Sequence, residues 1–197
     1  MSMTAIAVRD QALTRRTACT SLLLAFAMLL APPTSDAQGS DAQTNERSVM
    51  AAYIYRLITY VEWPVSVFAS ADAPIVIGVV NADDIASELE QVVQGRTAQG
   101  RRLQVRRVAA GEVPSGVHAL FIGGEIAPRF LQSAKTLTER SVLTITGVER
   151  GMDHGSVINF VQVDGRVRFE VNVGMAEKSG LRLSSRLLTV ATRVKAN

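Results

Sequence analysis

The clearest structural signal in the sequence is VINFVQVDGRVRFEVNV, residues 157–173. Its centre, Asp164-Gly165, favours a two-residue type I′ turn, because both central residues of that turn need a positive φ. Apolar and polar residues alternate on either side of the dipeptide, which is typical of paired antiparallel strands. We therefore predict a β-hairpin in which Val163 pairs with Arg166.

This register gives the hairpin two unlike faces. One face is apolar and carries Ile158, Phe160, Val167, Phe169 and Val171. The other carries charged and amide side chains among valines: Asn159, Arg166, Arg168, Glu170 and Asn172. The same register pairs Val161 with Arg168, Asn159 with Glu170 and Val157 with Asn172. A slip of one residue would exchange the two faces, so the pattern itself supports this pairing.

The polar face of the hairpin is the first candidate site. Arg168 and Glu170 are two residues apart and share a face, with Asn159 opposite Glu170. If the face is covered, its charges need partners or a cleft, because burying an isolated charge is costly. Two interpretations stay open. The face is either solvated, or it is a partner- or ligand-binding surface that includes Asn159, Arg168, Glu170 and Asn172.

An amphipathic helix is expected well before the hairpin. Apolar residues recur at steps of three and four over residues 49–61, which predicts a helix with one buried stripe. Pro64 ends it and pushes Trp63 towards an extended conformation. Trp63 either packs the helix end against the core or, with Glu62, offers an exposed anchor to a ligand or partner.

The segments between this helix and the chain end predict an α/β domain. The apolar run IVIGVV at residues 75–80 has the length and character of a strand buried on both faces. Further strands are expected at residues 103–108, 117–122 and 142–146, and helices at 83–93, 128–137, 175–179 and about 184–193. We therefore predict a mixed central β-sheet flanked by helices, with a C-terminal β-hairpin and terminal helices.

The N-terminus has the pattern of an export signal. Two arginines precede SLLLAFAMLLA, residues 21–31, and small residues follow just before Gln38. An apolar run of this length covers about half of a ~30 Å hydrocarbon core, which disfavours a stable membrane anchor. We expect residues 1–37 to be a signal peptide that is removed.

The remaining chain is expected to hold a flexible leader at residues 38–47, which is polar and lacks periodicity, and a single domain at 48–197. The only cysteine, Cys19, lies in the predicted signal peptide. Disulfides and thiol chemistry are therefore not expected in the mature chain.

Composition and motifs argue against several classes of function. Twenty-one basic and 18 acidic residues are too balanced for a nucleic-acid-binding surface. The two histidines, His118 and His154, have no close ligand spacing for a metal, and His118 is interpreted as a core histidine. No nucleophile elbow or phosphate loop is present. We expect no catalytic residues, metal or cofactor. An exported hydrolase whose loops assemble a site remains a third interpretation.

Several segments resemble the YfiR family, also called DUF4154. AAYIY at residues 51–55 followed by VEWP at 61–64 resembles the opening of that family. GRRLQVR (100–106), HALFI (118–122) and VLTI (142–145) resemble later family segments in the same order. The most specific matches are RVRFEVN (166–172) and GLRLSSRLL (180–188) near the end. The resemblance covers residues 49–191.

The resemblance implies a periplasmic regulator. The best-known family members bind and repress the periplasmic sensor domain of an inner-membrane diguanylate cyclase, which lowers cyclic-di-GMP and biofilm formation. They are α/β proteins that form homodimers, and some carry redox-linked cysteines, which this mature chain lacks. The alternative from the residues is a periplasmic small-ligand-binding or sensor protein with a cleft beside Trp63 and Arg168.

Overall fold

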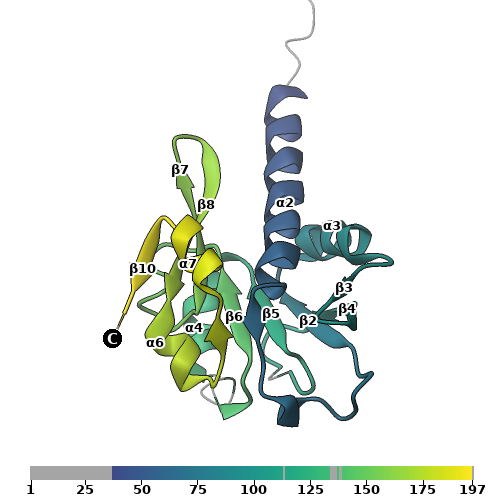
Figure 1. Cartoon of the computed structure of the whole chain (residues 1–197). Coiled ribbons are helices and arrows are strands. Elements are labelled where there is room, and N and C mark those ends of the chain that lie inside the picture. The colour runs from purple at the N-terminus through teal and green to yellow at the C-terminus, as the bar shows by residue number, and fades with distance from the viewer. Residues whose placement is uncertain (1–36, 113, 134–136, 138, 197) are drawn as a thin grey trace, which may run out of the picture. The chain divides into compact units, whose positions relative to one another are not determined.

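The computed structural model describes residues 37–112, 114–133, 137 and 139–196 (Figure 1). Residues 41–197 cluster into one compact unit. The predicted signal peptide falls almost entirely on residues 1–36, outside the described residues, and stays a prediction. Within the described ranges, no helix combines the length and apolar character needed to cross a membrane.

The centre of the fold is an eight-stranded mixed sheet with the order β10-β8-β7-β6-β5-β2-β4-β3. Its strands are β2 (Ile75–Val80), β3 (Thr97–Ala98), β4 (Arg101–Val108), β5 (Ala119–Ile122), β6 (Leu143–Thr146), β7 (Ile158–Val163), β8 (Arg166–Asn172) and β10 (Arg193–Lys195). The pairs β7–β8 and β3–β4 are antiparallel and the other neighbours are parallel. A small antiparallel sheet joins β1 (Val61–Glu62) to β9 (Arg182–Leu183). The predicted α/β fold with a mixed sheet is confirmed.

Helices cover both faces of this sheet. They are α2 (Ala37–Ile58), α3 (Asp83–Val93), α4 (Ala127–Ser133), α6 (Val173–Lys178) and α7 (Ser185–Val190), with short 3-10 turns η2 (Val65–Val67) and η3 (Gly124–Ile126). Strand β5 shows how the two faces are used. Phe121 packs in the larger core with α2 and α3, whereas Leu120 and Ile122 pack in a second core with Phe130 of α4. Burial on both faces explains why the central strands are continuous apolar runs.

The hairpin has the predicted register. Val163 pairs with Arg166 and Asn159 with Glu170. Asp164 and Gly165 have φ of 51° and 68°, as a type I′ turn requires. The apolar face packs against α2, where the ring of Tyr53 lies 6.2 Å from that of Phe160 and 5.9 Å from that of Phe169.

Two predictions about the ends of elements are wrong. Residues 38–47 were expected to be a flexible leader, but α2 begins at Ala37. The segment contains no proline, and adding residues to an existing helix costs far less than nucleating one. Arg47 Nε also lies 2.7 Å from an Asp84 carboxylate oxygen, and the Ser48 hydroxyl donates to Glu88 on α3 at 2.8 Å. At the other end, the last helix ends at Val190 and β10 follows.

Candidate functional site

Asn159, on the polar face of the hairpin, is buried. It is 1% exposed, and its side-chain oxygen accepts hydrogen bonds from the Thr146 hydroxyl at 2.8 Å and the Val148 amide at 3.2 Å. Gly151 packs so closely that a Cβ there would lie 2.3 Å from the Asn159 oxygen. Asn159 therefore fixes the loop that follows β6, and it is not available to a partner.

Asn172 also has a structural role. Its side-chain oxygen accepts from the Met175 amide at 3.0 Å and caps the N-terminus of α6, while its Nδ2 donates to the Met152 carbonyl at 3.3 Å. Glu170 is paired with Arg193 on β10, at 2.9 Å between Oε1 and Nε. Three of the four hairpin candidates are thus engaged inside the domain.

Trp63 lies in the core, which fits the first of its two interpretations, packing of the helix end. The residue is 7% exposed, and its indole nitrogen donates to the His118 carbonyl at 3.0 Å. The reason is that β1 pairs with β9 and directs the following residue into the larger core. Glu62 on the same strand is exposed and lies 3.9 Å from Arg182.

His118 is a core histidine, as predicted. Its Nδ1 accepts a hydrogen bond from the Val76 amide at 3.0 Å, and its ring stacks on Phe68 with centroids 4.6 Å apart. The guanidinium of Arg101 lies 3.8 Å from the Phe68 ring centroid. Burial lowers the pKa of His118, partly opposed by a hydrogen bond to the Val67 carbonyl, while the nearby charge of Arg101 lowers it further.

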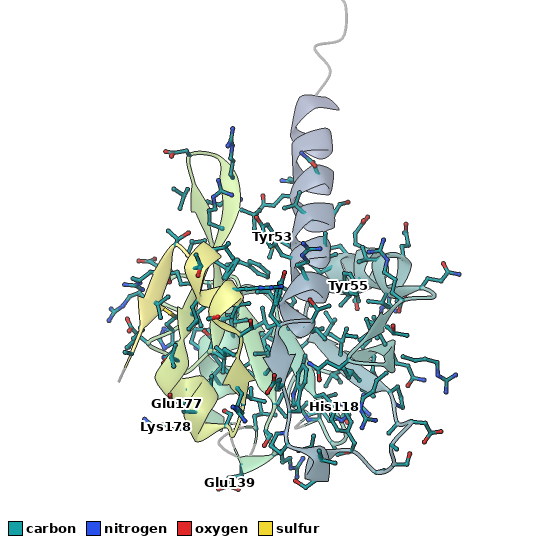
Figure 2. All side chains as sticks on the ribbon, in the orientation of Figure 1. Tyr53, Tyr55, His118, Glu139, Glu177 and Lys178 are labelled. Atoms are coloured by element: carbon teal, nitrogen blue, oxygen red, sulfur yellow. The ribbon has the colours of Figure 1, made fainter. Side chains whose placement is uncertain are left out.

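The fourth hairpin candidate, Arg168, lines an open groove between α2 and the hairpin, with a volume of about 460 Å³. Its lining includes Glu46, Val49 and Tyr53 from α2, and Gln162, Arg166 and Arg168 from the hairpin. A second pocket of about 260 Å³ shares Glu46, Gln162 and Val167 and adds Met50 and Phe160. We call these two pockets together the helix–hairpin groove. Figure 2 shows Tyr53 on the side of α2 that faces the hairpin, in agreement with its ring contacts.

The helix–hairpin groove combines an apolar floor with charged edges. Arg166 and Arg168 form no ion pair with any residue that the structure describes, and the same holds for Glu46. Unpaired charges around an apolar strip are suited to docking another protein, because they can orient a partner of complementary charge. Trp63 does not line this groove, whereas Arg168 does.

Of the candidate residues named from the sequence, only Arg168 lines the groove, and the helix side was missed. Glu46 was assigned to the leader, where nothing in the pattern marked it as part of a site. Its position one turn before the apolar stripe of α2 was the available signal. Among the described ranges, no group of three or more histidine, cysteine or acidic side chains is placed to hold a metal ion.

Comparison with known proteins matches most of this chain to one family model. The family model DUF4154, described as YfiR/HmsC-like, matches residues 47–192. No curated protein matches the chain significantly. A solved structure of a conserved domain protein from Vibrio cholerae O1 biovar eltor str. N16961 is similar at 12% identity and a TM-score of 0.45. That match covers 61% of this chain and 54% of the other, so this chain spans about half the length of that structure. A likeness at this score carries no argument about function.

Proposed function

Because the chain belongs to the YfiR/HmsC-like family, whose model matches residues 47–192, we propose that it is a non-catalytic periplasmic regulator of the cyclic-di-GMP pathway. In this proposal it binds the periplasmic sensor domain of an inner-membrane diguanylate cyclase and represses the enzyme. Repression lowers cyclic-di-GMP and biofilm formation. The family also leads us to expect a homodimer, which light scattering on the purified protein would test.

The observation that carries the docking part of the proposal is the helix–hairpin groove. It presents Arg166 and Arg168, which form no ion pair within the described part of the chain, beside an apolar floor that includes Val49 and Tyr53. An acidic, partly apolar segment of the sensor domain is the partner that this charge and shape would bind. Asn159, Asn172 and Trp63 are buried inside the domain, so in this proposal they do not touch the partner.

Repression then follows from a difference in affinity. A sensor domain that exchanges between active and inactive states is shifted to the state that the regulator binds more tightly. Shifting a balanced equilibrium to about 99 in 100 inactive needs a preference of about a hundredfold, and a larger one if the active state dominates at the start. An envelope signal that weakens this preference releases the enzyme.

The test is binding of the purified sensor domain, with cyclic-di-GMP measured in cells that carry the same variants. Arg168→Glu should weaken binding at least about tenfold and raise cyclic-di-GMP, because it reverses a charge at the groove. Arg186→Glu is the matched control, since Arg186 is an exposed arginine of α7 outside the groove. Equal binding by both folded variants would remove the groove from the proposal. Absence of any binding by the wild-type protein would contradict the repressor function itself.

A further inference from the structure

The strand order creates a crevice that the proposed function does not use. From β2 the chain passes through α3 to β4 on one side, while β5 lies on the other side of β2 and continues through α4 to β6. The helices α3 and α4 pack on opposite faces of the sheet. The connections that leave the carboxyl ends of β2 and β5 therefore diverge. In open α/β sheets this point of reversal is where ligands bind.

An open pocket of about 380 Å³ lies at this position. Its walls come from the residues that follow β2, β5 and β6, among them Asn81, Ala82, Gly123 and Gly147, and from α2 above them. This volume is within the range of small-molecule sites. We call it the switch-point pocket.

The glycines after β5 allow the loop that they form to pack closely against the loop after β2. A Cβ on Gly123 would lie 2.6 Å from the Asn81 carbonyl oxygen and 2.7 Å from the Ala82 Cβ. Gly124 has a φ of +68°, a conformation that side chains rarely adopt, and a Cβ there would lie 2.9 Å from the Asn81 amide nitrogen. Asn81 Nδ2 also donates to the Gly123 carbonyl at 3.3 Å. The loops after β2 and β5 therefore pack closely against each other, and the pocket between them is preformed.

The charges of the pocket determine which ligand it suits. Arg47 is neutralised by Asp84, at 2.7 Å, which leaves the Glu46 carboxylate without an ion-pair partner among the described residues. An anion is disfavoured, because the first turn of α3 already carries Asp83 and Asp84 at its N-terminus. Met50 supplies apolar surface, whereas Ile85 and Phe121, which also line the pocket, are largely buried in the core.

We propose that the switch-point pocket binds a small organic cation, an ammonium group on a short apolar body. The ammonium group pairs with Glu46, and the apolar body packs against Met50. Glu46 and Met50 also line the helix–hairpin groove, so an occupied pocket borders the surface proposed for the sensor domain. The proposal does not depend on that function and is tested without a partner.

The first experiment compares three probes that share a phenyl ring and a two-carbon skeleton and differ in charge. Calorimetry with phenethylamine, phenylacetate and 2-phenylethanol on the purified full-length protein should show saturable binding of the amine alone. Raising the salt concentration to about 1 M should weaken that binding, because the Debye length then falls to about 3 Å. Equal binding of all three probes, or no binding of the amine and of butylamine as an aliphatic substitute, would overturn the proposal.

The second experiment locates the site with matched variants. Glu46→Gln should weaken amine binding at least about tenfold, whereas Glu177→Gln should not, since Glu177 lies on α6 at the other end of the domain (Figure 2). Ala82→Leu fills only the switch-point pocket, and Gln162→Leu fills only the helix–hairpin groove. Binding lost in a folded Ala82→Leu variant and kept in Gln162→Leu supports the proposal. The reverse result would place the amine in the groove and overturn it.

Discussion

Arg193 on β10 forms a bidentate ion pair with the carboxylate of Glu170 on β8. Arg193 Nε lies 2.9 Å from Glu170 Oε1, and Nη2 lies 3.2 Å from Oε2. The Glu170 side chain is 14% exposed, so neighbouring atoms shield one end of this pair from water. The contact joins the last strand of the chain to the hairpin.

Breaking this pair should lower the free energy of unfolding. We expect Glu170→Gln to cost about 1 kcal/mol, and Glu170→Lys to cost more because it places a second cation against Arg193. Urea unfolding of Glu170→Gln, Arg193→Ala and the double variant measures the coupling. A coupling energy of zero would show that the pair adds nothing. Any effect of a Glu170 variant on signalling should be judged after its stability is known.

Stability should depend on pH through His118. Its pKa is lowered from the ordinary 6.5 by burial, so the unfolded chain binds a proton at this residue more readily than the folded one. The free energy of unfolding should therefore fall as the pH drops below 6.5 towards the folded pKa, and stay level above 6.5. His118→Asn keeps a hydrogen-bond acceptor for the Val76 amide and removes the proton-binding group. Unfolding measured at pH 5 and pH 7.5 should show a smaller difference for this variant than for wild type.

Two carboxyl groups with a lowered pKa affect stability at a lower pH than His118 does. The hydroxyl of Ser70 lowers the pKa of Asp72, and Lys195 lowers that of Asp153, each from 3.8. Their contributions are present above 3.8 and are lost only as the pH falls below it. A slope between pH 5 and 6.5 that persists in His118→Asn would therefore contradict the assignment to His118.

Gly151 should not tolerate a side chain. A Cβ at this position would lie 2.3 Å from the Asn159 oxygen and 2.4 Å from the Thr146 hydroxyl oxygen. Gly151→Ala must therefore displace the hydrogen bond between Thr146 and Asn159, and we expect a loss of about 2 kcal/mol or more. Thermal unfolding measures this, and Gly147→Ala serves as control, because a Cβ there meets only the flexible end of Met50 at 3.4 Å and Phe160 at 3.8 Å. Equal melting temperatures for the two variants would contradict the close packing.

Trp63 should report on the core and not on ligands. We expect blue-shifted emission from the buried indole, and unchanged intensity when a cation enters the switch-point pocket, which Trp63 does not line. Trp63→Phe should cost about 2 kcal/mol, from lost packing and the lost hydrogen bond to His118. The His118 carbonyl keeps its bond from the Leu143 amide, which limits the cost. Emission at the wavelength of a solvated indole would contradict this placement.

The sequence correctly predicted the elements that are determined by residues close together in the chain. The hairpin register follows from Asp164-Gly165 and from the alternation on either side of it. The helix at residues 83–93 has the predicted bounds, because its apolar stripe begins and ends with it. The start of α2 has no such pattern. Its polar residues are held by contacts with residues far away in the sequence, such as that of Arg47 with Asp84.

The same distinction applies to the candidate site. Arg168 lines the groove as a polar residue of the hairpin, but Asn159 and Asn172 have the same sequence pattern and are buried. The difference comes from the loop between β6 and β7, which supplies their partners Val148 and Met152. The residue spacing within the hairpin does not show which of its polar residues this loop buries. The switch-point pocket depends on strand order, which the sequence pattern does not contain.

Strand β10 has a consequence for how this protein is handled. It pairs with the outer side of β8, and Thr192 just before it donates to the Phe169 carbonyl at 2.9 Å. Without these few residues, β8 would present a bare row of amides and carbonyls that a strand of another molecule could join. A truncation before Thr192 should therefore promote aggregation, and affinity tags are better attached through a spacer that leaves the final strand in place.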